Sequence, residues 1–489
     1  MLKIDHRSAH PLYSVAATRS MEHAAQAMLP PNTLMQRAGL AVAQLALALA
    51  PHARRIWIAC GPGNNGGDGL EAALHLQRCG KSPIVTWLSN AEQAPSDAIV
   101  AHGRAMKAGV VFADAPPPTF DLCIDALLGI GGGIREPEGR MALWIHHMNA
   151  CNTPVLAVDV PTGLQADTGA LAHLSVKAAH TLSLLTLKPG LFTAHGRDAA
   201  GTVWLDNLAI DTTLPAHHPE NAPMAWLAGA PAGSQRLHAS HKGTYGDLAV
   251  IGGALGMTGA ALLAASAALH AGAGRVFVGL LDGGSLAVDT TQPELMFRPV
   301  NRLDLHTMTV VFGCGGGNDM ADLLFKTIST AAGIIIDADA LNSIAKNTLL
   351  QTQLTAREQR HGATVLTPHP LEAARLLGCT VAEVQQNRLA AAQQLAQRFA
   401  CTVVLKGSGT VVTAPGQTPV IDPTGNARLS TAGTGDVLAG MVGARLAGGL
   451  TPFEAACQAV YEHGLAADQW PDFVPLVAGT LARHIRPGK

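Results

Sequence analysis

The chain has 489 residues, of which 48% are hydrophobic and 14% are charged, a composition that excludes an intrinsically disordered protein. Its 33 Lys and Arg residues nearly balance its 35 Asp and Glu residues and form no basic blocks, which argues against a nucleic-acid or anionic-membrane surface. The eight cysteines include no C-x-x-C pair, so we expect buried thiols in a reducing compartment rather than a zinc site.

The N-terminal region predicts a soluble protein. Its first residues lack the apolar core of a signal peptide, and the uncharged stretch 39–50 is shorter than the ~20 residues that span a bilayer. We expect a buried helix at 39–50, and a helix followed by a strand at 258–281, where His270, Arg275 and several glycines interrupt the apolar run. From the same features we expect a cytoplasmic location.

Short β-rich runs alternate with helical segments along the chain. In the first half we predict strands at 55–60, 83–88, 110–112, 121–127, 154–160 and 180–185. In the second half we predict strands at 248–253, 275–280, 309–313, 333–339, 364–367 and 402–407. Helices are predicted between strands, for example at 67–79 and 138–150. Because the strands are continuous apolar runs, we expect them to be buried on both faces, as in parallel sheets.

Residues 211–235 separate the two halves. This segment is rich in Pro, Ala and Gly and has no clear period, which is typical of a linker. We therefore predict two α/β domains, at residues 1–225 and 226–489, with no internal repeat between them.

The stretch GPGNNGGDG (61–69) follows a predicted strand and precedes a predicted helix. It matches G-x-G-x-x-G, yet Ser89 and Asn90 stand where a dinucleotide site needs an acid, and Asp68 would repel a closely bound pyrophosphate. A P-loop is excluded because no Lys-Ser or Lys-Thr follows the glycines. We expect the glycines to let a ligand approach the backbone while asparagine amides supply oxygen and nitrogen.

Polar residues also follow three other predicted strands, and strand ends meet at one edge of a parallel sheet. Asn65, Asp125 and Thr162 offer oxygen ligands of the kind a hard monovalent cation prefers. Asp159 is then free for acid–base work, and Arg135 can pair with a phosphate. Lys188, in the stretch LKPG, is expected at the same edge.

The stretches GPGNNGGDG, DALLGIGGGIREPEG and VDVPTG resemble the NAD(P)H-hydrate epimerase domain, over roughly residues 12–220. The resemblance implies a Rossmann-like three-layer sandwich that binds hydrated NADH or NADPH, with Asp159 catalytic and K⁺ held by Asn65, Asp125 and Thr162. Ser is more usual in the family than Thr at 162, and the hydroxyl is kept. The resemblance implies substrate contacts by Asn64, Asn65, Gly66, Gly67, Asp68, Gly129, Ile130, Gly131, Gly132, Gly133, Ile134, Arg135 and Asp159.

In the second half, a Gly-Thr-Gly turn at 433–435 opens a predicted helix, whose free N–H groups form a site for an anion. Asp436 lies in the first turn, where a carboxylate can take a proton from a hydroxyl that receives a phosphoryl group. Upstream, VVLKGSGTVV (403–412) predicts strand, turn and strand, with a turn suited to nucleotide phosphates or ribose. His369 precedes a helix, and GCGGGND (313–319) follows a strand.

The stretches KGTYGD, GMTGAA, DADALN, TPHPLEAARLL, KGSGT and TAGTGD resemble the ADP-dependent NAD(P)H-hydrate dehydratase, a ribokinase-like three-layer sandwich, over about residues 236–485. The resemblance implies hydrate contacts by Ala260, Gly315, His369 and Asp436. It implies nucleotide contacts by Lys406, Gly407, Ser408, Gly409, Thr410 and Gly435. Phosphorylation of the C6 hydroxyl would create a good leaving group, with Mg²⁺ at the nucleotide phosphates. ADP as co-substrate is implied by the bacterial-type members, while the sequence alone leaves ADP and ATP open.

The sequence therefore predicts a bifunctional repair enzyme that epimerises the R and S hydrates at C6 and dehydrates the S form. Two alternatives remain open: a ribokinase-type small-molecule kinase with a regulatory nucleotide-binding N-terminal domain, and an inert nucleotide-sensing or protein-binding scaffold. The carboxylates of Asp125, Asp159 and Asp436 argue against the scaffold. We expect small-molecule partners, assembly into a homo-oligomer, and neither nucleic acid nor a membrane as partner.

Overall fold

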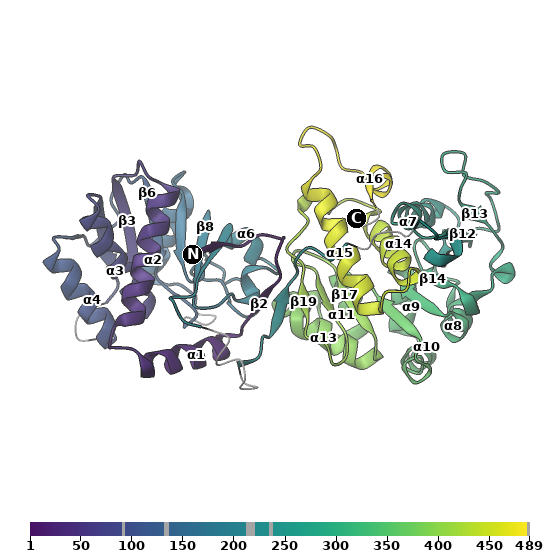
Figure 1. Cartoon of the computed structure of the whole chain (residues 1–489), viewed down its shortest axis with the longest axis horizontal. Helices are drawn as coiled ribbons and strands as arrows, with labels where there is room; N and C mark the ends of the chain where they lie inside the picture. The colour runs from purple at the N-terminus through teal and green to yellow at the C-terminus, as the bar shows by residue number, and fades with distance from the viewer. Residues whose placement is uncertain (90–92, 132–135, 212–220, 234–237, 487–489) are drawn as a thin grey trace. The chain divides into compact units, whose positions relative to one another are not determined.

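The computed structural model describes residues 1–89, 93–131, 136–211, 221–233 and 238–486 (Figure 1). The chain divides into two compact units, the first formed by Met1–Asp5 and His10–Trp226, the second by His6–Ala9 and Leu227–Lys489. In the second unit, Nδ1 of His6 lies 2.6 Å from the Tyr461 hydroxyl. In the part of the chain that the structure describes, no helix is both long and apolar enough to cross a membrane.

The first unit is built on a sheet with strand order β1-β9-β8-β7-β6-β3-β4-β5. All neighbouring strands are parallel except β1 and β9, which are antiparallel. The strands of this sheet are β1 (Leu2–Lys3), β3 (Arg55–Cys60), β4 (Ser82–Trp87), β5 (Val111–Phe112), β6 (Leu122–Ala126), β7 (Val155–Val158), β8 (His180–Leu184) and β9 (Thr202–Asp206). The two remaining short strands are β2 (His10–Leu12) and β10 (Ala225–Leu227). Strand β10 lies within the segment 211–235, which the sequence predicts to be a linker, and the two units meet in the chain at Trp226 and Leu227.

Helices cover both faces of this sheet, which confirms a three-layer α/β unit. They are α1 (Val15–Met28), α2 (Thr33–Leu49), α3 (Asn64–Arg78), α4 (Ser96–Lys107), α5 (Gly139–Ala150) and α6 (Gly196–Ala200). One core joins α2, α3 and α4 to the sheet through buried residues such as Val42, Leu70 and Ile58. A second core on the other face packs Trp144 of α5 against Trp57. The buried helix expected at 39–50 is the C-terminal part of α2.

Helix α3 begins at Asn64, three residues earlier than predicted, so most of the Asn-Gly stretch is helical rather than loop. Glycine disfavours helices, but close packing requires it here. A Cβ atom on Gly66 would lie 2.0 Å from the carbonyl oxygen of Gly61, and one on Gly69 would lie 2.6 Å from Cβ of Ala126. The glycines therefore let α3 start directly against the ends of β3 and β6.

The sheet of the second unit has the order β13-β12-β11-β14-β15-β16-β17-β18-β19. Strands from β13 to β17 are parallel to their neighbours, whereas β18 is antiparallel to both β17 and β19. The strands are β11 (Asp247–Gly252), β12 (Arg275–Leu280), β13 (Met296–Phe297), β14 (Thr309–Phe312), β15 (Gly333–Ile336), β16 (Ala363–Leu366), β17 (Thr402–Leu405), β18 (Val411–Thr413) and β19 (Val420–Ile421). The strand–turn–strand prediction at 403–412 is confirmed as the β17–β18 hairpin.

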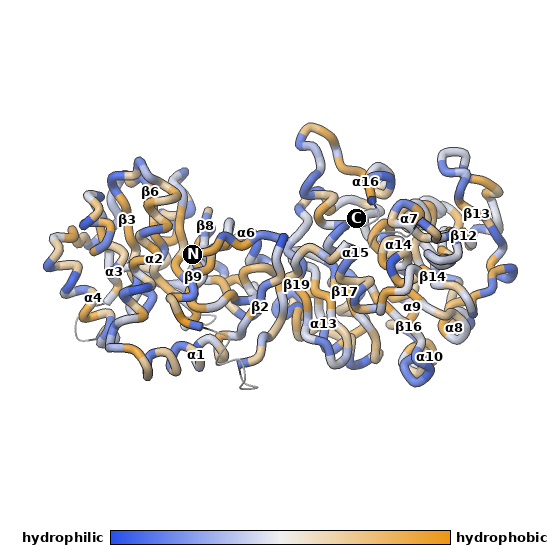
Figure 2. Tube along the Cα trace, in the orientation of Figure 1, coloured by the Kyte–Doolittle hydropathy of each residue, from blue (hydrophilic) through white to orange (hydrophobic). Residues whose placement is uncertain are grey.

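The helices of the second unit follow the same layered pattern. They are α7 (Thr258–His270), α8 (Ala321–Thr330), α9 (Ala338–Lys346), α10 (Thr348–Thr355), α11 (Pro370–Leu377), α12 (Val381–Gln386), α13 (Arg388–Phe399), α14 (Thr434–Ala447), α15 (Pro452–Asp468) and α16 (Ala478–His484). One short 3₁₀ helix, Pro189–Leu191, belongs to the first unit. The second unit has short 3₁₀ helices at Lys242–Tyr245, Val300–Arg302, Leu305–Thr307, Glu358–Arg360 and Ala427–Leu429. Small residues let α7 and α14 approach closely: a Cβ atom on Gly440 would lie 2.0 Å from the carbonyl oxygen of Ala264. Figure 2 shows hydrophobic residues concentrated inside each unit and hydrophilic residues on its loops.

Candidate active sites

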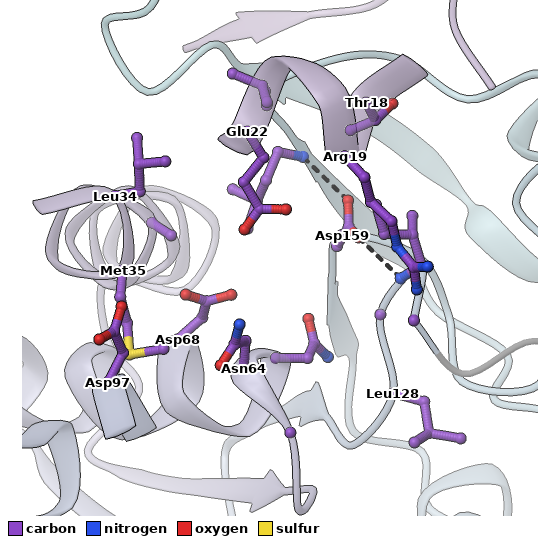
Figure 3. A pocket seen from close by; sticks show the side chains of 18 of the residues that line it. Thr18, Arg19, Glu22, Leu34, Met35, Asn64, Asp68, Asp97, Leu128 and Asp159 are labelled. Atoms are coloured by element: carbon purple, nitrogen blue, oxygen red, sulfur yellow. Dashed lines mark hydrogen bonds between the residues drawn. The ribbon is translucent and has the colours of Figure 1, made fainter. Parts of the chain in front are cut away.

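A cavity of about 400 Å³ lies in the first unit, between α1, α2, the start of α3 and the loops after β6 and β7 (Figure 3). Seven of the predicted substrate-contacting residues line it: Asn64, Asn65, Asp68, Gly129, Ile130, Gly131 and Asp159. Gly66 and Gly67 do not line it: a Cβ atom on Gly66 would meet Gly61, and one on Gly67 would meet Met35. The predicted residues Gly132, Gly133, Ile134 and Arg135 lie outside the described residues.

Asp159 follows β7 and has φ of 68°, a left-handed conformation that costs a non-glycine residue energy. Its Oδ1 atom accepts a hydrogen bond from Nζ of Lys188 at 2.5 Å, and Oδ2 accepts one from the backbone N–H of Ile130 at 3.1 Å. Lys188 is fully buried and also donates to the carbonyl oxygen of Leu184 at 2.8 Å. These contacts hold the Asp159 carboxylate at the cavity wall. The sequence predicted Lys188 at this edge without a role.

Asp125 and Thr162, two of the three predicted K⁺ ligands, are buried and in direct contact. The hydroxyl of Thr162 donates to Oδ1 of Asp125 at 2.8 Å, and the backbone N–H of Thr162 donates to Oδ2 at 2.9 Å. Burial raises the pKa of Asp125 to about 6 despite these bonds. Within the described residues no cation pairs with this carboxylate, so its charge is uncompensated.

Asn65, the third predicted K⁺ ligand, lines the cavity beside Gly129. A Cβ atom on Gly129 would lie 2.9 Å from the Oδ1 atom of Asn65 and 3.1 Å from Oδ2 of Asp159, so only glycine fits between them. The Nδ2 atom of Asn65 is buried and has no hydrogen-bond partner among the described residues, which leaves a donor for a ligand. The Asp125 carboxylate and the Thr162 hydroxyl, which the structure brings together, are oxygen ligands compatible with a monovalent cation.

Three more carboxyl groups line the cavity, and sequence reasoning assigned a role to only one of them. Asp68 is the predicted one; Glu22 comes from α1 and Asp97 from the start of α4 (Figure 3). Burial, then the nearby Asp159 and Glu22, raises the pKa of Asp68 well above its usual value. Burial and Asp159 also raise the pKa of Glu22. No sequence signal marks Glu22, because α1 reaches the cavity only through the tertiary fold.

In the second unit, the predicted residue Asp436 lies in the first turn of α14, as the sequence indicated. Its carboxylate, the thiol of Cys314 and the carboxylate of Asp337 have ligand atoms within 4.8 Å of one another. Burial, then repulsion by Asp337, raises the pKa of Asp436 to about 6. Asp337 follows strand β15 and was missed, although the rule that found Asp125, an acid at the end of a buried strand, applies to it equally.

The predicted nucleotide-binding turn joins this cluster through Lys406. Its Nζ atom lies 2.7 Å from Oδ1 of Asp337, and a Cβ atom on Gly435 would lie 3.3 Å from the same nitrogen. Gly407 has φ of 136°, and Thr410 donates to the carbonyl oxygen of Gly407 at 3.0 Å, which closes the turn. The turn also contains Ser408 and Gly409.

Two of the three other predicted hydrate contacts, Ala260 and Gly315, lie side by side. Gly315 has φ of 59°, and a Cβ atom on it would lie 3.0 Å from Cβ of Ala260. His369 is the N-cap of α11, and its Nδ1 accepts hydrogen bonds from the N–H groups of Leu371 and Glu372. Burial raises the pKa of Glu372 to about 7, even though Lys406 opposes the change. The hydrogen bonds to Nδ1 therefore give His369 a structural role as the cap of α11. Its Nε2 atom lies 3.3 Å from Oε1 of Glu372.

Comparison with known proteins relates both units to described families. Residues 248–486 match the family model described as NAD(P)H-hydrate dehydratase, and residues 31–190 match the YjeF-related protein N-terminus. The bifunctional NAD(P)H-hydrate repair enzyme of Escherichia coli (strain K12) is 38% identical over 467 residues, covering 89% of this chain and 84% of that protein. The ADP-dependent (S)-NAD(P)H-hydrate dehydratase of Neisseria meningitidis is 43% identical over 261 residues, covering 52% of this chain and 86% of that protein.

A solved structure is also similar to the second half of the chain. The ADP/ATP-dependent NAD(P)H-hydrate dehydratase of Bacillus subtilis, co-crystallised with ATP and Mg²⁺, is 31% identical with a TM-score of 0.45. The match covers 51% of this chain and 90% of that chain.

Proposed function

The chain belongs to the family of bifunctional NAD(P)H-hydrate repair enzymes, and on that premise we propose how its two units divide the reaction. The enzyme repairs hydrated NADH and NADPH by epimerisation and by nucleotide-dependent dehydration. We assign the epimerisation to residues 1–225 and the dehydration of the S hydrate to residues 226–489. ADP is the proposed co-substrate, yielding AMP and phosphate.

In the epimerase unit, the substrate carries a hydroxyl at C6 next to a ring nitrogen. Loss of that hydroxyl leaves an iminium ion, and water can then add to either face of the ring. Asp159 is the proposed acid–base group, because Lys188 and the Ile130 N–H orient its carboxylate at the cavity wall. This oriented carboxylate is the observation that carries the assignment. Asn64, Asn65, Gly129, Ile130 and Gly131 are the proposed surroundings of the nicotinamide ring.

K⁺ is the proposed cation of this unit, held by Asn65, Asp125 and Thr162. The uncompensated charge of the buried Asp125 carboxylate supports this ligand set. When bound, K⁺ supplies positive charge beside the cavity. The hydroxyl and the backbone N–H of Thr162 both donate hydrogen bonds to Asp125 and thereby orient its carboxylate.

In the dehydratase unit, Asp436 is the proposed base that removes the proton from the C6 hydroxyl during phosphoryl transfer. Asp436 lies in the first turn of α14, and the free N–H groups at a helix start can stabilise the charge on the transferred group. The proposed nucleotide contacts are Lys406, Gly407 to Thr410 and Gly435. The proposed hydrate contacts are Ala260, Gly315 and His369. Elimination of phosphate then restores the dihydronicotinamide ring.

Mg²⁺ is proposed at the nucleotide phosphates, and when bound it neutralises their charge. The carboxylate oxygens of Asp337 and Asp436, close to one another, are hard ligands compatible with it. We also propose that the enzyme is cytoplasmic and homo-oligomeric. The free state of all eight cysteines supports a reducing compartment.

The proposed function is tested by incubating the purified chain with hydrated NADH and ADP. Recovery of the dihydronicotinamide absorbance, with AMP and phosphate in equal amounts, supports repair. A ribokinase-type kinase would instead accumulate a phosphorylated product and restore no absorbance. Pure R hydrate distinguishes the two activities, because its conversion requires epimerisation before dehydration.

A further inference from the structure

Two carboxyl groups reach the epimerase cavity from different elements. Asp159 follows β7 and lies beside Lys188, whereas Asp68 projects from α3, with Glu22 of α1 above it (Figure 3). Figure 3 shows Asp68 and Asp159 on different walls of the cavity, so a planar ring bound between them would have one carboxyl group on each side. Inversion at C6 needs this arrangement, since the hydroxyl must leave one face and water must add to the other.

The two carboxyl groups differ in their partners. The carboxylate of Asp159 accepts hydrogen bonds from a buried cation, Lys188, and from the backbone N–H group of Ile130. Among the described residues no cation pairs with Asp68, and its neighbours include the carboxylates of Asp159, Glu22 and Asp97. Burial together with this repulsion raises the pKa of Asp68 well above its usual value. Paired groups in such different environments form an acid and a base.

We propose that Asp68 is the second acid–base group of the epimerisation and serves the ring face opposite the one served by Asp159. This inference rests on the proposed epimerase function. It assigns to Asp68 a part in the reaction itself, beyond contact with the substrate.

The step balances without a further reactant. The Asp68 carboxyl gives its proton to the C6 hydroxyl, the C6–O bond breaks with its electron pair on oxygen, and water leaves as the nitrogen lone pair forms N1=C6. A second water then attacks C6 from the other face, the N1=C6 electron pair returns to nitrogen, and Asp159 takes the proton. The reverse reaction starts from protonated Asp159 and ionised Asp68. Before another turnover in the same direction, Asp159 releases its proton to water and Asp68 takes one from water.

The remaining charges of the cavity support the cationic intermediate of this scheme. Glu22 and Asp97 also line the cavity, so its carboxyl groups outnumber its cations among the described residues. Those carboxyl groups that are ionised favour an iminium ion over the neutral hydrate, because charge that develops in the transition state meets fixed opposite charge. Bound phosphates of the dinucleotide need not lie near these groups, since they are remote from C6 in the substrate.

The test uses the full-length chain and each pure hydrate epimer with oxygen-18 in its C6 hydroxyl. Asp68→Asn should slow epimerisation by at least about 100-fold, after subtraction of the spontaneous rate. It should still release label, with configuration retained, from the epimer whose hydroxyl faces Asp159. Asp159→Asn should do the opposite and release label from the other epimer alone.

This mirror-image pattern distinguishes a reacting group from a structural one. If Asp68→Asn epimerises at the wild-type rate, or loses label release from both epimers equally, the inference is wrong. Asp114→Asn is the control, because Asp114 is an exposed carboxyl of the same unit that does not line the cavity. It should epimerise normally. A wild-type chain that fails to epimerise would contradict the proposed function instead, and thermal melts verify that each variant is folded.

Discussion

The ammonium nitrogen of Lys188 lies 2.5 Å from Oδ1 of Asp159, at a point where both residues are buried. The pair holds Asp159 in a left-handed backbone conformation, which persists only where surrounding contacts determine it. A buried ion pair of this kind is costly to break, because the remaining charge has no partner and little water.

We therefore predict that Lys188→Met lowers the free energy of unfolding of the first unit by about 3–5 kcal/mol and abolishes epimerisation. Urea unfolding and an epimerase assay measure the two effects. Lys177→Met, at an exposed lysine, is the control and should change neither. The double variant with Asp159→Asn should recover part of the stability but none of the activity; a loss that is simply additive would contradict a paired role.

The dehydratase reaction should depend on pH through Asp436. A general base works only when ionised, and burial next to Asp337 raises its pKa to about 6. We expect turnover of the S hydrate to be constant above about pH 7 and to fall about tenfold per unit below pH 6. A rate profile with saturating ADP measures this dependence.

Replacement of the same carboxylate separates the two activities. Asp436→Asn should reduce dehydration by about 100-fold or more and leave epimerisation unchanged, since the residue lies in the other unit. Asp472→Asn, at an exposed position, is the control. Undiminished dehydration by Asp436→Asn would exclude it as the base.

The K⁺ assignment predicts different results for two substitutions of Thr162. Thr162→Ser keeps the hydroxyl that donates to Asp125, so epimerisation and its K⁺ dependence should persist. Thr162→Val removes that donor from a buried carboxylate and should raise the K⁺ concentration needed for half-maximal activity at least about tenfold. Titration of each variant with KCl, at constant ionic strength, measures the difference. Equal K⁺ dependence in both variants would argue against this ligand set.

The close approach of α3 to β3 predicts a strong effect of one methyl group. Gly66→Ala places Cβ 2.0 Å from the carbonyl oxygen of Gly61 and should cost about 3 kcal/mol of stability. Gly63→Ala is the matched control, because a Cβ atom there has no atom within 4 Å. Chemical unfolding of the two variants tests the contrast, and equal stabilities would contradict the packing argument.

Much of the fold could be predicted because the relevant signals are local. The apolar run at 55–60 became β3 with the predicted bounds, and Asp436 lies in the first helical turn after a Gly-Thr-Gly stretch, as expected. The start of α3 was misplaced because glycine normally disfavours a helix. Only the contact with Gly61 explains why this helix tolerates it.

The sequence by itself determined the two α/β units and the polar residues at their strand ends, because periodicity and composition act over a few neighbouring residues. Tertiary structure alone decided that Glu22, from a helix with no motif, faces the cavity that Asp68 and Asp159 line. It also decided that Lys188 pairs with Asp159 and Lys406 with Asp337. These ion pairs and the lining of the cavity depend on how elements far apart in the sequence pack. Packing fixes the distance between charged groups and their access to water, and these two factors govern how strongly a buried group binds its proton.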